Sequence, residues 1–325
     1  MRPQTDSIMV SRTAIGRARR SAARLGALVV LAFGACAALA QQAPATAAGG
    51  PPPEVKVTTT LLGGSVYGID GRGGRMAALV GSDGVLLVDA QFPDVTDKIV
   101  AAIKGITPAP LRFLVNTHVH GDHTGGNENF AKLGVTILGR PELRAQQLTP
   151  RPAPNGQTPP VAPAAALPII LFENPTTIEL DGEEVRLIPL PPAHTDGDTA
   201  VLFKKANVLM TGDVFRSEGM PAAAIGNGGS VLGILKCIDL FLQVSDASTK
   251  VVPGHGPVAN REALVFHRQV LVTVRDRVAK AKAEGKTLEQ VQAMKPTAEF
   301  DQRVGGPPAF IPQFVATLYN ELPAR

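Results

Sequence analysis

Cysteine is scarce in this sequence, and its scarcity limits what can stabilise the fold. The 325 residues include only Cys36 and Cys237. Cys36 lies in a segment that we expect to be removed, which leaves Cys237 without a partner. A disulfide-stabilised scaffold is therefore excluded, and the folded protein must depend on its hydrophobic core or on bound metal. Cys237 itself lies in the apolar run 231–242, where a buried, unreactive thiol is expected.

Excess charge of either sign is missing from most of the chain. Six arginines and one aspartate give residues 1–40 a net charge of +5, and the whole chain is +4, so the remainder is −1. A nearly neutral protein has no electrostatic field that would attract nucleic acid or anionic lipid. We therefore expect neither as a partner, and a small molecule as the substrate.

The apolar run at residues 25–40 is too short to anchor the chain in a membrane, because its 16 residues fall below the roughly 20 that span a bilayer. It follows a basic stretch that ends at Arg24, and it closes with the small-residue pattern Ala38-Leu39-Ala40. This is the plan of a secretory signal peptide. We expect cleavage after Ala40, a periplasmic or secreted protein, and no stable membrane association afterwards. Lipid attachment at Cys36 is the alternative.

The rest of the chain divides into a linker, a folded domain and a tail. Residues 41–54 are rich in alanine, proline and glycine and are expected to be disordered. The domain is predicted to span residues 55–295, followed by a tail, residues 296–325, with a helix expected at 312–322. Inside the domain, residues 146–168 hold seven prolines, so this segment is predicted to lack regular structure and to form either a lid over the site or an idle surface loop.

Short β-rich runs split by glycine and proline alternate with helical patterns along the domain. Two groups of strands, each followed by helices, predict two sheets packed face to face with helices outside. Strands are expected at residues 55–62, 65–69, 76–80, 85–89, 111–115, 135–138, 169–172, 177–180, 185–189, 199–203, 207–211 and 250–252. Helices are expected at residues 93–103, 126–133, 231–242, 261–284 and 287–294.

Five of the six histidines follow β-rich runs, where functional side chains concentrate. His118 and His120 can share one face of an extended segment, because alternate residues of a strand point the same way. Asp122 and His123 then turn the other way, so this segment can offer two pairs of ligands to two adjacent metals. Imidazole and carboxylate ligands suit zinc.

Three further candidate ligands lie at later strand ends. His194 and His255 occupy turns rich in glycine and proline, and Asp213 follows the run 207–211. An isolated histidine is more often a packed or surface side chain, but the number, type and placement of these residues together predict a metal site. The sixth histidine, His267, shares the apolar stripe of the helix at 261–284 and is assigned to packing.

The order of these motifs resembles the metallo-β-lactamase superfamily. The resemblance rests on residues 118–123 followed by His194, Asp213 and His255, and on Asp89, which resembles the carboxylate beneath the histidine loop. It covers about residues 55–294, and it is specific for the superfamily but not for a substrate. It implies an α+β protein with a four-layer αββα sandwich and a site at one edge of the sheets.

The resemblance also implies a role for each residue. His118, His120 and His194 would hold one metal, Asp122, His123 and His255 would hold the second, and Asp213 would bridge them. The expected cofactor is two Zn²⁺ per chain, with iron or manganese as alternatives. Asp122 would also act catalytically by orienting the attacking hydroxide. Asp89 and Asp198 are expected to support the ligands from behind, since metal-bound imidazoles donate their other N–H to a carboxylate or carbonyl, although Asp198 is equally compatible with a turn residue.

The resulting hypothesis is an exported dinuclear zinc hydrolase in which hydroxide attacks the carbonyl of an ester, thioester, lactam or amide. Arg216 is a candidate for binding a substrate carboxylate, with ordinary surface charge as the alternative. An aspartate at 213 resembles glyoxalase II and related hydrolases more than true zinc β-lactamases, and His120 argues against the flavodiiron branch. A β-lactamase proper, a mononuclear iron enzyme resembling the persulfide dioxygenases, and a non-catalytic metal-binding protein remain the alternatives.

Overall fold

The computed structural model describes residues 54–150 and 160–323. The expected signal peptide, nearly all of the expected linker and residues 151–159 of the proline-dense segment lie outside the described residues. Within the described part, no helix combines the length and the apolar character that crossing a bilayer requires.

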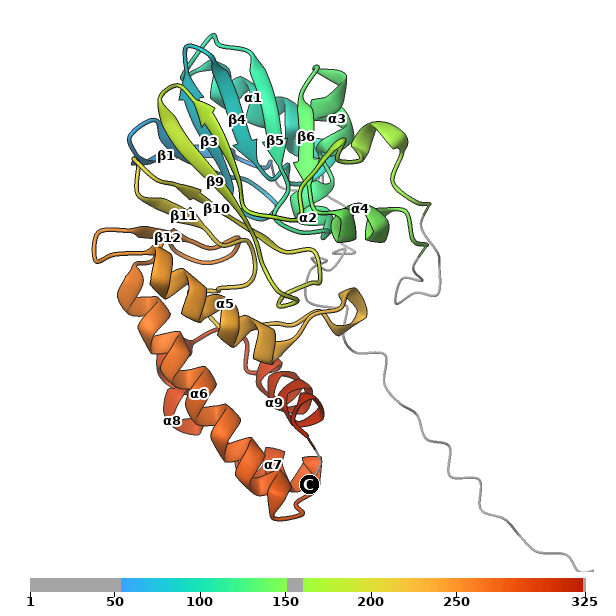
Figure 1. Ribbon diagram of the computed structural model, residues 1–325, viewed down its shortest axis with the longest axis vertical. Coiled ribbons are helices and arrows are strands. Elements are labelled where there is room, and N and C mark those ends of the chain that lie inside the picture. The colour runs from blue at the N-terminus through green and yellow to red at the C-terminus, as the bar shows by residue number, and fades with distance from the viewer. Residues whose placement is uncertain (1–53, 151–159, 324–325) are drawn as a thin grey trace, which may run out of the picture. The chain divides into compact units, whose positions relative to one another are not determined.

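The first sheet has seven strands in sequence order, from β1 at one edge to β7 at the other (Figure 1). Pairing is antiparallel from β1 to β4 and parallel from β4 to β7. Because β4, β5 and β6 run the same way, the loops that follow them leave at one edge of the sheet. The strands are β1 (Thr58–Gly63), β2 (Val66–Asp70), β3 (Met76–Gly81), β4 (Gly84–Val88), β5 (Leu111–Val115), β6 (Thr136–Gly139) and β7 (Ile170–Leu171).

The second sheet has five strands in the order β12-β11-β10-β9-β8. The pairing of β11 with β12 is parallel, whereas the other pairs are antiparallel. The ends of β11 and β12 are therefore side by side, and the loops that follow them meet. The strands are β8 (Thr176–Leu180), β9 (Glu183–Pro189), β10 (Thr199–Phe203), β11 (Val208–Met210) and β12 (Lys250–Val252).

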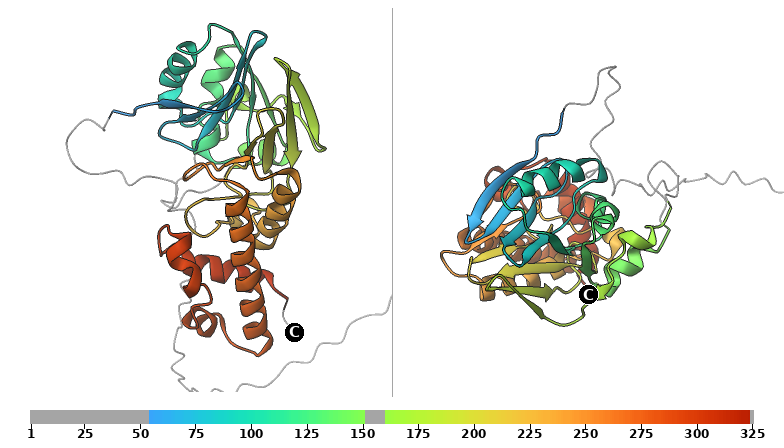
Figure 2. Two further views of the ribbon diagram at one scale, coloured as in Figure 1. Left: turned by 90° about the vertical axis from the view of Figure 1, so that its left-hand side faces the viewer. Right: turned by 90° about the horizontal axis from the view of Figure 1, so that it is seen from above.

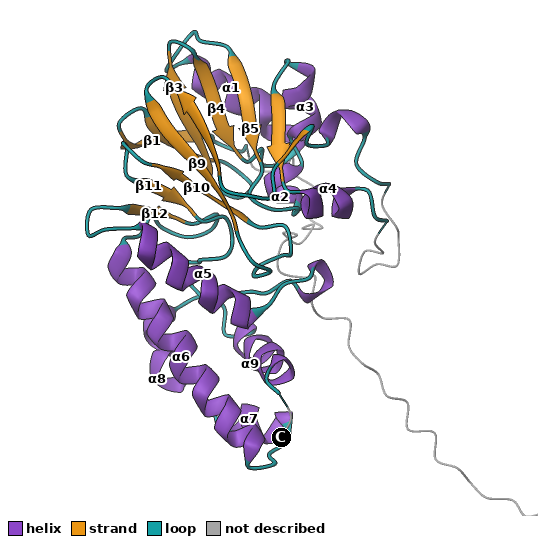
Figure 3. Ribbon diagram, in the orientation of Figure 1, coloured by secondary structure: helices purple, strands orange, loops and turns teal. Residues whose placement is uncertain are grey.

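Helices cover the outer faces of both sheets (Figures 1 and 2). One apolar cluster joins α1 and α3 to the first sheet, a second fills the space between the sheets, and a third joins the second sheet to α5 and α6. The predicted four-layer αββα sandwich is thus confirmed (Figure 3). The α-helices are α1 (Thr96–Lys104), α2 (Gly121–Thr124), α3 (Asn127–Lys132), α4 (Pro141–Gln147), α5 (Val231–Val244), α6 (Arg261–Ala283), α7 (Leu288–Ala293), α8 (Ala298–Val304) and α9 (Phe310–Glu321). Short 3₁₀ turns occupy Pro93–Val95, Ala164–Ala166 and Ile225–Asn227.

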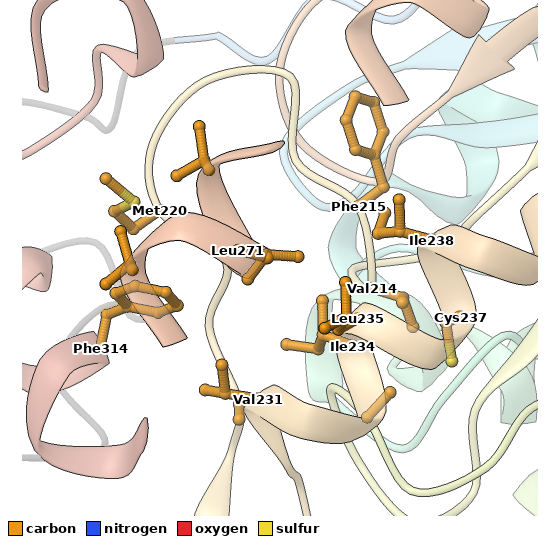
Figure 4. Packing of buried hydrophobic residues seen from close by; sticks show 14 of the residues in the cluster. Val214, Phe215, Met220, Val231, Ile234, Leu235, Cys237, Ile238, Leu271 and Phe314 are labelled. Carbon is orange, nitrogen blue, oxygen red and sulfur yellow. The ribbon is translucent and has the colours of Figure 1, made fainter. Parts of the chain in front are cut away.

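The third cluster is the core of the C-terminal half (Figure 4). Ile234 and Ile238 of α5 pack with Leu271 of α6 and Phe314 of α9, all buried. Cys237 lies in the same cluster as a free, buried thiol, and burial raises its pKa. The expected burial of Cys237 is therefore confirmed.

Three helices of the described chain were not predicted from the sequence: the four-residue helix α2, and the helices α4 and α8. Helix α4 has seven residues, starts with Pro141 in its first turn and buries Leu143 and Gln146. Helix α8 also has seven residues and lies in the tail, which was expected to be irregular up to residue 312. Helices this short show barely two turns of periodicity, and their stability comes from tertiary packing, so the apolar pattern alone did not reveal them.

Helix α5 begins directly beside the turn that carries His194, and a side chain from α9 caps it. Ser230 at the N-cap accepts a hydrogen bond from the amide of Gly233. Glu321 adds a second cap: its carboxylate accepts from the amides of Val231 and Leu232 at 2.7 and 2.8 Å. The amide of Ser230 donates in turn to the carbonyl of Ala193, next to His194. Glu321 thereby ties the end of the chain to the start of α5.

Replacing Glu321 by glutamine should lower the free energy of unfolding by about 1 kcal/mol, the usual value of a helix N-cap. Glutamine keeps one acceptor oxygen but loses the second acceptor and the negative charge at the helix N-terminus. Urea unfolding of both proteins measures the difference. The exposed Glu173→Gln provides the control and should leave stability unchanged. Equal midpoints for wild type and Glu321→Gln would contradict the capping role.

Candidate metal centre

The seven predicted ligand residues meet at one edge of the sandwich. They come from the segment that follows β5 and continues into α2, from the turn between β9 and β10, and from the loops after β11 and β12. Since these loops leave the sheets side by side, residues far apart in sequence become neighbours. Three groups hold their ligand atoms within 4.8 Å of one another: His118, His120 and His194; His118, His123 and Asp213; and Asp122, His123 and His255.

Asp213 lies between the first and third groups. Its Oδ2 is 3.6 Å from His194 Nε2 and 3.3 Å from His255 Nε2, and its Oδ1 is 3.3 Å from His123 Nε2. The first group is closed by His120 Nδ1, which is 2.9 Å from His194 Nε2. Ligand atoms about 2.1 Å from a tetrahedral ion lie about 3.4 Å from one another. The observed spacings therefore match ligand shells around small cations.

Several buried polar atoms at this edge have no hydrogen-bond partner among the described residues. They are His118 Nε2, His123 Nε2, His255 Nε2 and both carboxylate oxygens of Asp213. Burying polar atoms without partners costs free energy, yet here the atoms converge on one another. A divalent cation would satisfy all of them, so this donor set fits a metal. Its imidazole and carboxylate composition suits zinc.

The electrostatics divide the histidines into two kinds. Burial lowers the pKa of His118 well below its usual range and that of His120 to about 4, so both rings are neutral at pH 7 and have a free lone pair. Burial also acts on His255 and His123, but carboxylates outweigh it. Asp122 and Asp213 raise the pKa of His255 to about 9, and Asp213 and Asp89 raise that of His123. A metal at the third group must therefore displace protons.

Comparison with known proteins identifies the family. Residues 70–258, more than half of the chain, match the model of the metallo-beta-lactamase superfamily. The chain belongs to the metallo-beta-lactamase superfamily. This is a family of metal-dependent hydrolases, and the fold and the candidate metal-binding groups agree with that membership.

Two curated relatives match about half of this chain. The chain is 26% identical over 181 residues to "Beta-lactamase-like protein 2 homolog" of Caenorhabditis elegans, which covers 54% of this chain and 53% of the relative. It is 30% identical over 159 residues to "2,4-dinitroanisole O-demethylase subunit alpha" of Nocardioides sp. strain JS1661. This alignment covers 48% of this chain and 46% of the relative. The chain thus spans about half the length of these relatives.

Solved structures of metallo-beta-lactamases share the fold over about two thirds of this chain. The metallo-beta-lactamase of Pontibacter korlensis has a TM-score of 0.55 at 18% identity and is covered to 99%, with 67% of this chain aligned. That of Hirschia baltica has a TM-score of 0.53 at 21% identity and is covered to 98%, with 66% of this chain aligned. At such low identity the likeness establishes the fold alone.

Asp89 contacts the segment that carries His118 and His123. Its Oδ2 is 2.8 Å from His123 Nδ1 and accepts the Thr117 hydroxyl, while its Oδ1 accepts the Thr117 amide. The Thr117 hydroxyl also contacts His118 Nδ1 at 3.0 Å. One buried carboxylate therefore orients a histidine of each group. Thr117 was not predicted as a site residue, although its position directly before His118 was a usable signal.

Of the two roles expected for Asp198, the contacts match that of a turn residue. Asp198 does not contact an imidazole ring among the described contacts; its carboxylate accepts from the amide and hydroxyl of Thr195. It is therefore a turn residue that shapes the segment after His194, and burial raises its pKa to about 6. The partner of His194 Nδ1 is the carbonyl of Ala222, at 2.5 Å. A backbone partner 28 residues away leaves no signature in the sequence.

Two further predicted residues lie outside the converging group. Arg216 is half-buried and has no hydrogen bond or ion pair within the described ranges, which leaves its guanidinium free. His267 is 3% exposed, packs edge-on against Phe215, and has its Nδ1 3.2 Å from the carbonyl of Ala263. The expected packing role of His267 matches this environment.

The stability of the metal-free protein should fall as the pH rises from about 6.5 to 9. The pKa of His255 is raised from 6.5 to about 9 on folding, so its contribution is complete below pH 6.5 and is lost as the pH passes 9. His123 acts in the same direction. Urea unfolding in excess chelator at several pH values measures this slope. His255→Gln should make the slope shallower, and an identical slope in the variant would contradict the assignment.

Proposed function

We propose that this chain is an exported dinuclear zinc hydrolase that cleaves a bond next to a carbonyl group in an ester, thioester, lactam or amide. The observation that carries the proposal is the complete donor set, with the buried Asp213 carboxylate between two groups of imidazoles. Export rests on residues 1–40, whose pattern is that of a signal peptide.

His118, His120 and His194 would hold one ion, Asp122, His123 and His255 the other, and Asp213 would contact both. Two divalent ions held there would lower the pKa of a shared water toward about 7 and polarise a carbonyl oxygen. The side chains of His120 and His255 are partly exposed while His118, His123 and Asp213 are buried. A substrate would therefore approach from the side of His120 and His255.

Asp122 has the properties of a group that orients the attacking water. Burial raises its pKa, but the nearby imidazoles of His255 and His123 outweigh burial, and the net pKa is lowered. The carboxylate is thus ionised at neutral pH and can accept a hydrogen bond or a proton from water. Its Oδ2 is 3.0 Å from His255 Nε2, at the accessible side of the centre.

The aspartate at position 213 favours esters and thioesters over β-lactams, because this residue type resembles the glyoxalase II branch more than the true zinc β-lactamases. The name of the Nocardioides relative adds an aryl ether to the substrates worth testing. Free Arg216 is compatible with a substrate that carries a carboxylate.

Elemental analysis of the purified protein, followed by a turnover assay on the same sample, tests the proposal. We expect two zinc ions per chain and hydrolysis of at least one ester, thioester, lactam or amide in a panel that also includes aryl ethers, whereas cleavage of an aryl ether alone would contradict attack at a carbonyl. One iron per chain would instead favour a persulfide-dioxygenase-like enzyme. Two metals without turnover of any compound would favour a non-catalytic metal-binding protein.

Asp122→Asn should lower kcat by about 10²- to 10⁴-fold, the usual contribution of a positioned acid–base group. Asparagine keeps the shape of the side chain but can neither carry the negative charge nor accept a proton. Steady-state kinetics with metal content measured in parallel separates this effect from metal loss. Asp97→Asn, on the exposed face of α1, is the control and should behave as wild type. Full turnover of a fully loaded Asp122→Asn would contradict the role.

A further inference from the structure

The turn between β2 and β3, residues 71–75, lies directly behind the group Asp122, His123 and His255. The amide of Gly74 donates to the carbonyl of Asp122 at 3.1 Å. A Cβ at position 74 would come within 2.2 Å of the His123 ring, so only glycine allows this close approach. Through Gly74 alone, the turn therefore touches the backbone of Asp122 and the ring of His123.

Arg75 supports His255, the third residue of the group, by donating hydrogen bonds to the carbonyls of the two glycines that flank it. Its backbone amide donates to the carbonyl of Gly254 at 2.7 Å. Its Nη1 donates to the carbonyl of Gly256 at 2.8 Å. The two bonds hold the chain before and after His255 against one residue, so the backbone at His255 has little freedom to rotate.

His255 depends on this backbone support more than its neighbour does. His123 is fully buried and its Nδ1 is fixed by Asp89. His255 is 29% exposed, and within residues 54–150 and 160–323 its Nδ1 has no hydrogen-bond partner. Metal-binding histidines ordinarily use that second nitrogen to fix the ring. The orientation of the His255 ring must therefore come from the peptide that carries it.

The guanidinium of Arg75 is itself fixed and neutralised. Its side chain is 16% exposed, and its Nε is 2.8 Å from Asp70 Oδ1. The ion pair with Asp70 leaves Nη1 aimed at Gly256 and offsets a positive charge that would otherwise lie near a cation site. The planar guanidinium can make both bonds at once, whereas a lysine ammonium on its flexible stem cannot reproduce this geometry.

We propose that Arg75 is a positioning residue that holds His255 in place for the metal of the Asp122, His123 and His255 group, with Asp70 orienting the guanidinium. The inference rests on the proposed dinuclear centre. It predicts a selective effect: loss of the Arg75 side chain weakens one metal position and leaves the other, at His118, His120 and His194, unchanged.

The test is a titration of the metal-free protein with cobalt(II) in competition with a chromophoric chelator, together with the visible spectrum of the bound cobalt. For Arg75→Gln we expect binding of one of two cobalt ions to weaken by about 10- to 100-fold, the usual effect of removing a group that orients a ligand. The other ion should bind with wild-type affinity, and only one component of the spectrum should change. Arg75→Lys and Asp70→Asn should show the same selective loss to a smaller extent.

Arg72 offers a matched control in the same turn. Its guanidinium pairs with Asp94 at 2.8 Å and lies over the Phe92 ring, with about half of its side chain exposed. Arg72→Gln should therefore bind both cobalt ions as wild type does. Circular dichroism of each metal-free variant checks folding, and if Arg75→Gln does not fold, Arg75→Lys and Asp70→Asn decide the question.

The outcomes separate this inference from the proposed function. If wild type binds two cobalt ions and the folded Arg75 and Asp70 variants bind both as tightly, the positioning role is wrong while the dinuclear centre stands. An equal loss of both ions would also overturn it, because the role is specific to His255. If wild type itself does not bind two ions, the proposed function fails first.

Discussion

The buried carboxylate of Asp213 is the constraint on which the site depends. Its two oxygens lie within 4.0 Å of ring nitrogens from His118, His123, His194 and His255, and neither oxygen has a hydrogen-bond partner in the described structure. An ionised carboxylate without compensation is costly in a protein interior. The charge must be balanced by protonated imidazoles or by metal, and the lowered pKa of Asp213 reflects the first of these. When metal binds, its positive charge replaces that of the protonated imidazoles beside Asp213.

The fold supplies the precision that such a centre needs. Parallel pairs in both sheets, β4 with β5 and β11 with β12, bring four loops to one edge. The ligands are then oriented by groups outside the donor set: Asp89 and Thr117 for the histidine loop, the Ala222 carbonyl for His194, and Arg75 for the peptide of His255. Each support comes from a different part of the chain, so the packed sandwich as a whole keeps the donors in place.

The sequence predicted the sheet-forming segments and picked out the side chains that converge at the edge of the sandwich, because both leave local signals. Strand 111–115 matches β5, and histidines after strands are visible without a structure. The sequence did not predict the features that depend on contacts between distant segments. The short helices α2, α4 and α8 depend on packing, and the partner of His194 Nδ1 is a carbonyl 28 residues away. For Asp198 the sequence left a turn role and a contact to an imidazole equally open, and only the folded chain shows its bonds to Thr195. The pairing of Arg75 with peptides 254 and 256, 181 residues away in the second case, follows only from the folded chain.

In the proposed dinuclear centre, one metal ion lies on each side of Asp213. Crystals of the purified protein grown with zinc, with diffraction data collected on both sides of the zinc absorption edge, locate the ions. We expect two anomalous peaks, one among His118, His120 and His194 and one among Asp122, His123 and His255, with Asp213 in contact with both. A single peak, or peaks away from these side chains, would show that the proposed centre is wrong.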